Sequence, residues 1–124
     1  MYQKNILRKK YFNLRKKKYY EIDKNFFYPL ISLIKSKLKK EHVKMALYYP
    51  TSFEINVLKF LDNKFMKKKN ILLPVIEENN RMNFYPWQKK NVLLVNKFGI
   101  LEPIKTKFKI PNLILLPILA FDKN

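Results

Sequence analysis

VKMALYYPTSFEINVLKFLDNKFMKKKNILLPV, residues 43–75, is the stretch that decides the fold. Val43 to Tyr49 is rich in apolar and aromatic residues and is stopped by Pro50, which predicts a strand. Ile71 to Val75 is a second compact apolar run and predicts another buried strand. Between them, a helix with Asn56 as its N-cap is predicted by apolar residues at helical spacing. These residues are Val57, Leu58, Leu61 and Phe65. Strand, helix and strand in this order imply parallel strands joined by a right-handed crossover.

The flanking segments extend this pattern to an α/β fold, a layered and mostly parallel sheet flanked by helices. Lys4 to Lys18 predicts an amphipathic helix whose apolar residues are Leu7, Tyr11 and Leu14. A second helix is expected from Phe27 to Leu38, with Pro29 either in its first turn or at a kink. Met82–Tyr85 and Val92–Val95 are weaker strand candidates.

The chain closes with NLILLPILAFDKN, from Asn112 to Asn124. Its apolar run, LILLPILAF, is the best strand candidate of the sequence and reads as a strand buried on both faces. Pro117 in this run and Pro74 in the earlier one are awkward for central strands and more natural at strand ends. Because a strand buried on both faces needs a covered sheet, we expect further chain to follow. Residues 1–124 are therefore predicted to form a single incomplete domain that lacks the C-terminal part of its fold.

The net charge of +18 is the most conspicuous feature of the composition. One explanation is a surface that binds polyanions such as nucleic acid. Another is coding bias, because only Arg8, Arg15 and Arg81 are arginine among the 27 basic residues, and the lysine excess comes with many Asn, Ile, Tyr and Phe. Such a skew is what an A+T-rich genome would impose on any protein. Net charge speaks to non-specific binding and not to fold, and no nucleic-acid-binding motif accompanies it.

Several classes of protein are excluded by what the sequence lacks. It has no cysteine, so disulfides, thiolate chemistry and cysteine-built zinc sites are ruled out. It has no apolar run near the roughly 18 residues of a membrane-spanning helix, and it opens on charged and aromatic residues where a signal peptide has an apolar core. We therefore expect a cytoplasmic protein. With one glycine and one histidine, it carries no glycine-rich phosphate loop, Gly-x-Ser-x-Gly elbow or His-Glu-x-x-His motif.

The remaining candidates come from their position at the predicted sheet. Ligands of parallel α/β sheets bind at the carboxyl ends of the strands, and Glu54 follows the first strand there. A carboxylate at this edge could accept paired N–H donors of a heterocycle such as a pterin. Spacing also fits an exposed glutamate that stabilises a helix N-terminus. Gly99 is predicted at a backbone conformation that other residues resist, or in an ordinary turn, and His42 is assigned no role.

Four segments resemble, in order and spacing, the 5-formyltetrahydrofolate cyclo-ligase family, also called methenyltetrahydrofolate synthetase. They are KNILR (Lys4 to Arg8), YYPTSFEIN (Tyr48 to Asn56), NKFGILEP (Asn96 to Pro103) and LILLPILAFD (Leu113 to Asp122), with ILLPVI and MNFYPW between them. The family's pattern continues after this point with a glycine-rich stretch, RLGxGxGYYDR, that helps to hold ATP phosphates and magnesium, and none of it is present here. The chain thus resembles the N-terminal two-thirds of the family's fold, as a fragment or as the product of a truncated gene.

The resemblance implies an ATP-dependent cyclisation of 5-formyltetrahydrofolate to 5,10-methenyltetrahydrofolate, with release of ADP and phosphate. ATP phosphorylates the formyl oxygen, N10 attacks the carbon of the resulting iminophosphate, and phosphate leaves. Such an enzyme must hold the polyphosphate with cations and keep the pterin in line. The implied ligands are a reduced folate, ATP and Mg²⁺, and catalytic residues and magnesium ligands stay unassigned.

The resemblance also assigns residues one by one. Lys4 and Arg8 match the family's N-terminal ATP-contacting pair, one helical turn apart. Glu54 matches the glutamate that recognises the pterin, and Tyr49 matches a position that lines the substrate. Phe98 falls where an aromatic or apolar residue borders the folate pocket. Trp87 would add to that wall, although core packing explains Phe98 and Trp87 equally well.

Two other functions remain open on the sequence. The chain could be a small basic nucleic-acid-binding protein, whose affinity would fall steeply with salt and would not respond to Glu54→Ala. It could also be a non-catalytic relic of the cyclo-ligase that keeps folate or ATP contacts without the phosphate loop. We favour small-molecule substrates, a monomer, and neither membrane nor nucleic acid as partners, and we expect little activity from this length of chain alone.

Overall fold

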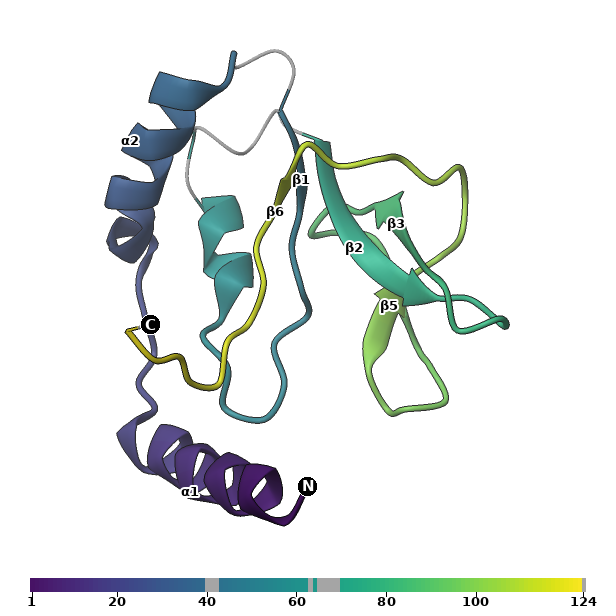
Figure 1. Cartoon of the computed structure of the whole chain (residues 1–124). Helices are drawn as coiled ribbons and strands as arrows, with labels where there is room; N and C mark the ends of the chain where they lie inside the picture. The colour runs from purple at the N-terminus through teal and green to yellow at the C-terminus, as the bar shows by residue number, and fades with distance from the viewer. Residues whose placement is uncertain (40–42, 63, 65–69, 124) are drawn as a thin grey trace.

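The computed structural model describes residues 1–39, 43–62, 64 and 70–123 (Figure 1). The helices are α1 (Tyr2–Lys18), the 3₁₀ helix η1 (Lys24–Phe27), α2 (Tyr28–Lys37) and the 3₁₀ helix η3 (Val57–Asp62). The strands are β1 (Lys44–Ala46), β2 (Asn70–Ile76), β3 (Met82–Pro86), β4 (Leu93–Val95), β5 (Leu101–Pro103) and β6 (Leu113–Ile114). In the part of the chain given above, no helix is both long enough and apolar enough to cross a membrane.

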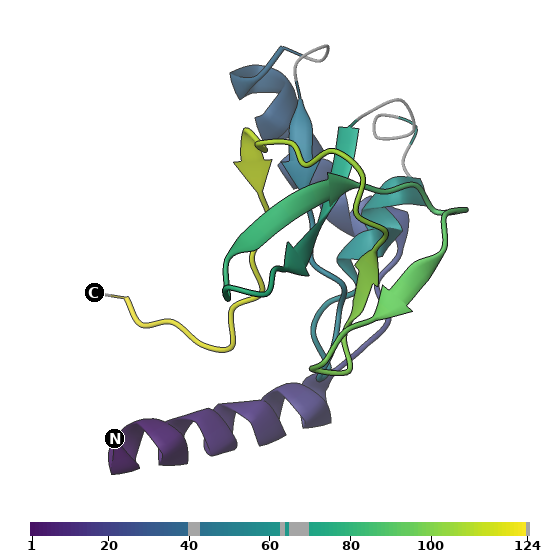
Figure 2. The ribbon, with the colours of Figure 1, turned by 90° about the vertical axis from the view of Figure 1, so that its right-hand side faces the viewer.

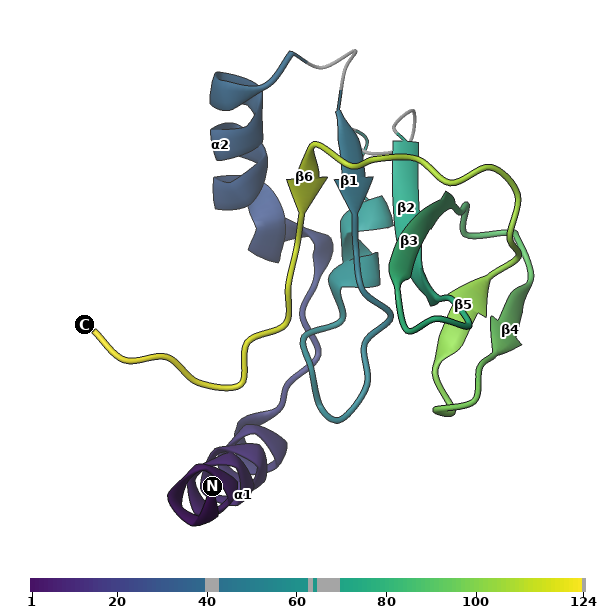
Figure 3. The same ribbon diagram turned by 45° about the vertical axis from the view of Figure 1, so that its right-hand side comes forward.

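A mostly parallel sheet in the order β3-β2-β1-β6 forms the centre of the molecule (Figure 3). β1 is parallel to both β2 and β6, with Met45 opposite Ile71 on one side and Leu113 on the other. β3 is antiparallel to β2, and β4 and β5 form a separate antiparallel hairpin. The predicted parallel strands and the α/β class are confirmed. Pro74 lies in β2 beyond the last pair with β1, where its missing N–H costs no ladder bond on that side.

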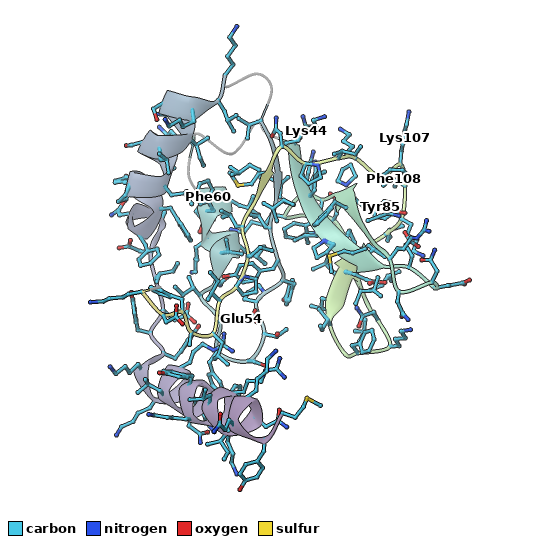
Figure 4. All side chains as sticks on the ribbon, in the orientation of Figure 1. Lys44, Glu54, Phe60, Tyr85, Lys107 and Phe108 are labelled. Atoms are coloured by element: carbon cyan, nitrogen blue, oxygen red, sulfur yellow. The ribbon has the colours of Figure 1, made fainter. Side chains whose placement is uncertain are left out.

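The hydrophobic core lies between one face of this sheet and the helices η1, α2 and η3. Alternate residues of the strands face these helices, as expected for a pleated strand. The buried cluster contains Phe27, Ile31, Ile34, Val43, Met45, Leu47, Val57, Phe60, Ile71 and Leu73. Phe60 is fully buried, and its ring centroid lies 4.8 Å from that of Phe27. Figure 4 shows Phe60 reaching from η3 into this space.

The helix predicted after Asn56 is a 3₁₀ helix and not an α-helix. In a 3₁₀ helix residues three apart lie on one side, and Val57 and Phe60 are accordingly the buried pair, while Leu58 and Leu61 are only half-buried. The predicted N-cap is also wrong, because the side-chain oxygen of Asn56 is buried without a hydrogen-bond partner among the described residues. Phe65 and His42 lie outside the described residues.

The second predicted helix is confirmed, with a different start. A 3₁₀ turn precedes it, and the Asp23 carboxylate caps that turn by accepting hydrogen bonds from the backbone N–H groups of Asn25 and Phe26. Pro29 then lies in the first turn of α2, where a missing N–H is tolerated, and does not kink the helix. Ile31 and Ile34 are the buried residues of α2.

The closing segment is not a strand buried on both faces. β6 covers only Leu113–Ile114 and pairs with β1 alone, so it lies at the edge of the sheet as the structure describes it. Leu115 and Leu119 after it are half-buried, but Leu116, Ile118 and Phe121 are exposed, at 73%, 67% and 87%. A strand with one neighbour cannot bury its whole apolar run, which is why the hydrophobic pattern overstated this strand.

Helix α1 is confirmed from Tyr2 to Lys18, but its predicted apolar stripe is not buried. No residue of α1 is buried, and Leu7 and Leu14 are 50% and 40% exposed. The helix lies at the lower end of the molecule in Figures 1 to 3, beneath the loop that follows β1. It contacts the body through Phe12, whose ring centroid is 6.1 Å from that of Phe53 in this loop. The helix therefore lies across the edge of the sheet where β1 ends.

Candidate functional site

A pocket of about 410 Å³ lies at the carboxyl end of β1. It is formed by Arg15 and residues 18–20 around the end of α1, by Tyr48 and residues 53–55 of the loop after β1, and by residues 116–118 after β6. We call it the Glu54 pocket. It occupies the edge of the sheet at which parallel α/β folds bind ligands. Figure 4 shows Glu54 in the loop just above α1.

The loop that carries Glu54 has a strained backbone. Ser52 and Phe53 both have positive φ, at 52° and 61°, a region that residues other than glycine rarely adopt. This turn directs Phe53 against α1, where its ring meets those of Phe12 and Tyr19 edge to face, with centroids 6.1 and 6.0 Å away. Strain of this kind persists where surrounding contacts hold it, and it clusters at ligand sites. The aromatic contacts are thus what fixes the loop and helix α1 together.

Glu54 itself is half-buried and its carboxylate is held by its own turn. The backbone N–H of Thr51 donates to Oε2 of Glu54 at 3.1 Å, and the backbone N–H of Glu54 donates to the Thr51 carbonyl at 3.0 Å. This arrangement restricts the rotamers of the side chain while it borders the pocket. A preorganised acceptor of this kind can bind paired N–H donors of a ligand.

Tyr48 links the acidic and basic sides of the Glu54 pocket. Its hydroxyl donates to the Ile55 carbonyl at 2.9 Å. Burial raises the pKa of Tyr48, the neighbouring Glu54 carboxylate raises it further, and the Arg15 guanidinium opposes both. Arg15 and Lys18 of α1 line the pocket together with Glu54, so the pocket is bipolar, with a carboxylate on the loop and cations on the helix.

Lys4 and Arg8 are exposed and do not line the Glu54 pocket. At about 100° per residue, Lys4, Arg8 and Arg15 lie within about 40° of each other around the helix axis. Tyr11 shares this face, and together with Phe12 and Arg15 it is among the least exposed residues of α1. At 1.5 Å per residue, Arg8 lies roughly 10 Å and Lys4 roughly 16 Å along the axis from Arg15. The two predicted cations thus continue the row that begins at the pocket.

Tyr49 and Phe98 do not line the Glu54 pocket. Tyr49 is half-buried and its neighbour Tyr48 is the residue that borders the cavity. Phe98 lies in the turn between β4 and β5 and is 59% exposed. The adjacent Gly99 has φ +73°, which confirms the predicted unusual backbone, and a Cβ there would meet nothing within 4 Å. The glycine is thus required by conformation and not by crowding.

Trp87 lies in the hydrophobic core and is 6% exposed. Its backbone N–H donates to the carbonyl of Ile71, near the amino end of β2, because β3 runs antiparallel to β2. It borders a different cavity, of about 550 Å³, together with residues such as Pro86 and Pro103. Trp87 and Glu54 are therefore at opposite edges of the sheet, and the predicted folate wall at Trp87 has no support from this geometry.

The residues that the structure describes bring together no group of three His, Cys, Asp or Glu side chains able to hold a metal ion. The Mg²⁺ that the family resemblance implies is an ion that proteins usually hold with one or two carboxylates together with the phosphates of a substrate.

Comparison with known proteins agrees with this architecture. Residues 7–124 match the 5-formyltetrahydrofolate cyclo-ligase family. The chain belongs to this family. It is also similar to the NMR structure of the 5,10-methenyltetrahydrofolate synthetase of Aquifex aeolicus, with 29% identity and a TM-score of 0.68. That alignment covers 96% of this chain and 62% of the Aquifex chain. A search of curated protein sequences found no significant match.

Of the residues that line the pocket, the sequence and its resemblance to the cyclo-ligase family pointed to Glu54. They did not point to Arg15, Tyr48 or Phe53. Arg15 had a detectable signal, since it lies on the same helical face as Lys4 and Arg8. Phe53 had none, because its role depends on two positive φ values that no spacing rule predicts.

Proposed function

We propose that this chain carries the folate-binding and part of the nucleotide-binding surface of a 5-formyltetrahydrofolate cyclo-ligase. The reaction would convert 5-formyltetrahydrofolate and ATP into 5,10-methenyltetrahydrofolate, ADP and phosphate. One observation carries the proposal: Glu54 borders a pocket at the carboxyl edge of the sheet, directly against the cationic helix α1. Membership of the family and the likeness to the Aquifex synthetase support the same conclusion.

The proposed roles follow from the chemistry of each side chain. The Glu54 carboxylate would accept N–H groups of the pterin and keep it from turning in the pocket. Lys4 and Arg8 would lower the charge repulsion of the polyphosphate, so that the formyl oxygen can approach the terminal phosphorus. Transfer of that phosphoryl group turns the formyl oxygen into a good leaving group. N10 then attacks the carbon and loses its proton to water, and the carbon–oxygen bond breaks as phosphate departs.

Tyr49 and Phe98 are proposed as secondary contacts of the folate. Tyr49 belongs to the loop after β1 and Phe98 to the turn between β4 and β5, and this loop and this turn point toward the same side of the molecule in Figures 1 and 3. A half-exposed aromatic ring such as that of Phe98 can stack on the ligand without any cost to the core. We propose no role for Trp87 in ligand binding.

Binding measurements test the proposal with this chain. Titration calorimetry with 5-formyltetrahydrofolate should give a measurable affinity, and Glu54→Gln should weaken it by about 10- to 100-fold, because a hydrogen bond to a charged group contributes about 1.5–3 kcal/mol. Affinity for ATP should change by less than about threefold. Glu78→Gln is the matched control, since Glu78 is exposed after β2 and lies outside the Glu54 pocket.

Absence of folate binding by the unaltered chain would contradict the proposal, and so would an equal effect of the Glu54 and Glu78 variants. Turnover is measured separately, on a protein that also contains the family's glycine-rich stretch, by the near-ultraviolet absorbance of the methenyl product. There, Glu54→Gln should lower the rate at subsaturating folate. A salt-sensitive affinity for nucleic acid that ignores Glu54 would favour the alternative of a basic nucleic-acid-binding protein.

A further inference from the structure

Arg15 has a buried donor without a hydrogen-bond partner at the edge of the Glu54 pocket. Its Nε atom is inaccessible to solvent and makes no hydrogen bond within the described residues. The ion pairs among these residues join Lys89 to Asp62 and Lys105 to Glu77, and neither involves Arg15. A buried donor that is left unsatisfied costs free energy unless a ligand supplies the missing acceptor.

We propose that Arg15 binds an oxyanionic group of the ligand in the Glu54 pocket, either a phosphate of ATP or a glutamyl carboxylate of the folate. This inference rests on the proposed function, because it takes these two compounds as the ligands. It adds a specificity-determining residue to Lys4, Arg8 and Glu54.

The surroundings of Arg15 hold its guanidinium in place for such a contact. The guanidinium carbon lies 6.0 Å from the centroid of the Phe12 ring, a cation–π distance. Phe12 is itself fixed by its edge contact with Phe53. Arg15 is half-buried, and its charge reaches Tyr48 on the pocket wall, where it opposes the rise of the tyrosine pKa. The side chain is thus oriented before a ligand arrives, which lowers the entropic cost of binding.

Arginine chemistry suits an oxyanion better than the surrounding lysines do. The guanidinium is planar and can donate two parallel hydrogen bonds to one carboxylate or phosphate, whereas an ammonium group acts as a point charge. Only three of the 27 basic residues of the chain are arginine. Two of them, Arg8 and Arg15, are seven residues apart on the same face of α1, two helical turns along.

The bipolar pocket also dictates how a ligand would be oriented. The Glu54 carboxylate repels anions and accepts N–H donors, so the uncharged pterin belongs on its side. Arg15 and Lys18 offer positive charge on the opposite side, toward α1. A ligand with a donor-rich ring at one end and an oxyanion at the other matches this polarity. A ligand without the oxyanion would fill the pocket but leave Arg15 unsatisfied.

Two pairs of ligands test the proposal and separate the two possible oxyanions. Wild type, Arg15→Gln and Arg15→Lys are titrated with 5-formyltetrahydrofolate and with 6-methyl-5-formyltetrahydropterin, which lacks the glutamyl carboxylates, and then with ATP and with adenosine. Arg15→Gln should weaken binding of one oxyanionic ligand by about 10- to 100-fold and of its uncharged analogue by less than about twofold. Arg15→Lys should weaken binding of the same ligand by an intermediate factor, because lysine keeps the charge but cannot donate two parallel hydrogen bonds.

Lys17→Gln is the matched control, since it removes the same charge from the opposite side of α1, about 200° around the axis from Arg15. It should change every affinity by less than about twofold. Thermal unfolding of each variant shows whether it is folded, and Arg15→Lys keeps the test valid if Arg15→Gln is not. Equal losses for a ligand and its uncharged analogue, or equal losses for Arg15→Gln and Lys17→Gln, would overturn the inference. If the unaltered chain binds neither folate nor ATP, the proposed function itself fails.

Discussion

The sheet with its helices and the helix α1 with the closing segment are two different kinds of region. In the first, Met45, Phe60 and Leu73 are fully buried, and three helices cover one face of the sheet. In the second, no residue of α1 is buried, and Leu116 and Ile118 are more than half exposed. The Glu54 pocket lies where the two regions meet, because α1, the closing segment and the loop after β1 all line it. Stability should therefore come mainly from the first region, and ligand chemistry from the junction of the two, where the loop that carries Glu54 meets α1.

Phe60→Ala should cause the largest loss of stability. Phe60 is fully buried against Phe27, and loss of such a ring costs about 3–5 kcal/mol through lost transfer free energy and the remaining cavity. Leu14→Ala in α1 should cost less than about 1 kcal/mol, because Leu14 is 40% exposed. Urea unfolding followed by circular dichroism gives both values. Similar losses for the two variants would mean that α1 belongs to the cooperative core and would remove the contrast between the regions.

The double variant Lys4→Ala/Arg8→Ala should change the free energy of unfolding little. It should lower the affinity for ATP by about tenfold, which is the low end for charge-assisted contacts at exposed positions. The control is Lys9→Ala/Lys10→Ala, which removes the same charge from other sides of α1. Affinities are measured at two salt concentrations. If both double variants lose the same factor, the helix acts through net charge alone, as a nucleic-acid-binding surface would.

The elements that could be predicted from the sequence are those decided by local pattern. β2 is a compact apolar run, and α2 has its proline in the first turn. η3 and β6 were misjudged for non-local reasons. Whether residues 57–62 wind as an α or a 3₁₀ helix depends on packing of Val57 and Phe60 against the sheet. Whether the closing apolar run is buried depends on how many strands flank it, and the run itself does not encode that number.

The residues of the candidate site also fall into two groups, those that could be predicted from the sequence and those that could not. Glu54 could be found because a position after a parallel strand is set by topology. Phe53 could not, since two positive φ values turn its loop onto α1, and no spacing rule shows that Tyr48 and not Tyr49 borders the pocket. Trp87 was grouped with the folate residues on resemblance, but the antiparallel direction of β3 carries it to the other edge of the sheet.

Glu77 directly follows the carboxyl end of β2 and makes polar contacts within the first region. Its carboxylate accepts hydrogen bonds from Lys105 Nζ at 2.6 Å and from the Tyr85 hydroxyl at 2.7 Å, and these lower the pKa of Glu77 from 4.5 to about 2. Because the pKa is lower in the folded state, the contact stabilises the fold above about pH 4.5 and is lost as the pH falls towards 2. If hydrophobic burial alone stabilised the first region, loss of this contact would not change the stability of the protein.

Glu77→Gln should therefore lower the melting temperature at pH 7, and the gap to wild type should close between pH 4.5 and pH 2. Differential scanning calorimetry across this range measures the gap. Glu78→Gln is the control, as Glu78 is the exposed neighbour on the same turn. A gap that stays constant with pH would show that Glu77 acts through packing and not through its charge.

The smallest effect is expected at the ion pair between Lys89 and Asp62, which joins the turn after β3 to η3. Nζ and Oδ1 are 2.5 Å apart, and the hydrogen bond from Lys89 lowers the pKa of Asp62. The side chains are nevertheless 69% and 37% exposed, so water screens the attraction and Asp62→Asn should cost about 0–1 kcal/mol. The loss should shrink further in 1 M salt, because the Debye length there is only about 3 Å. A salt-independent cost above about 2 kcal/mol would mean that η3 is held by a polar contact as well as by Phe60, and that burial alone does not define the first region.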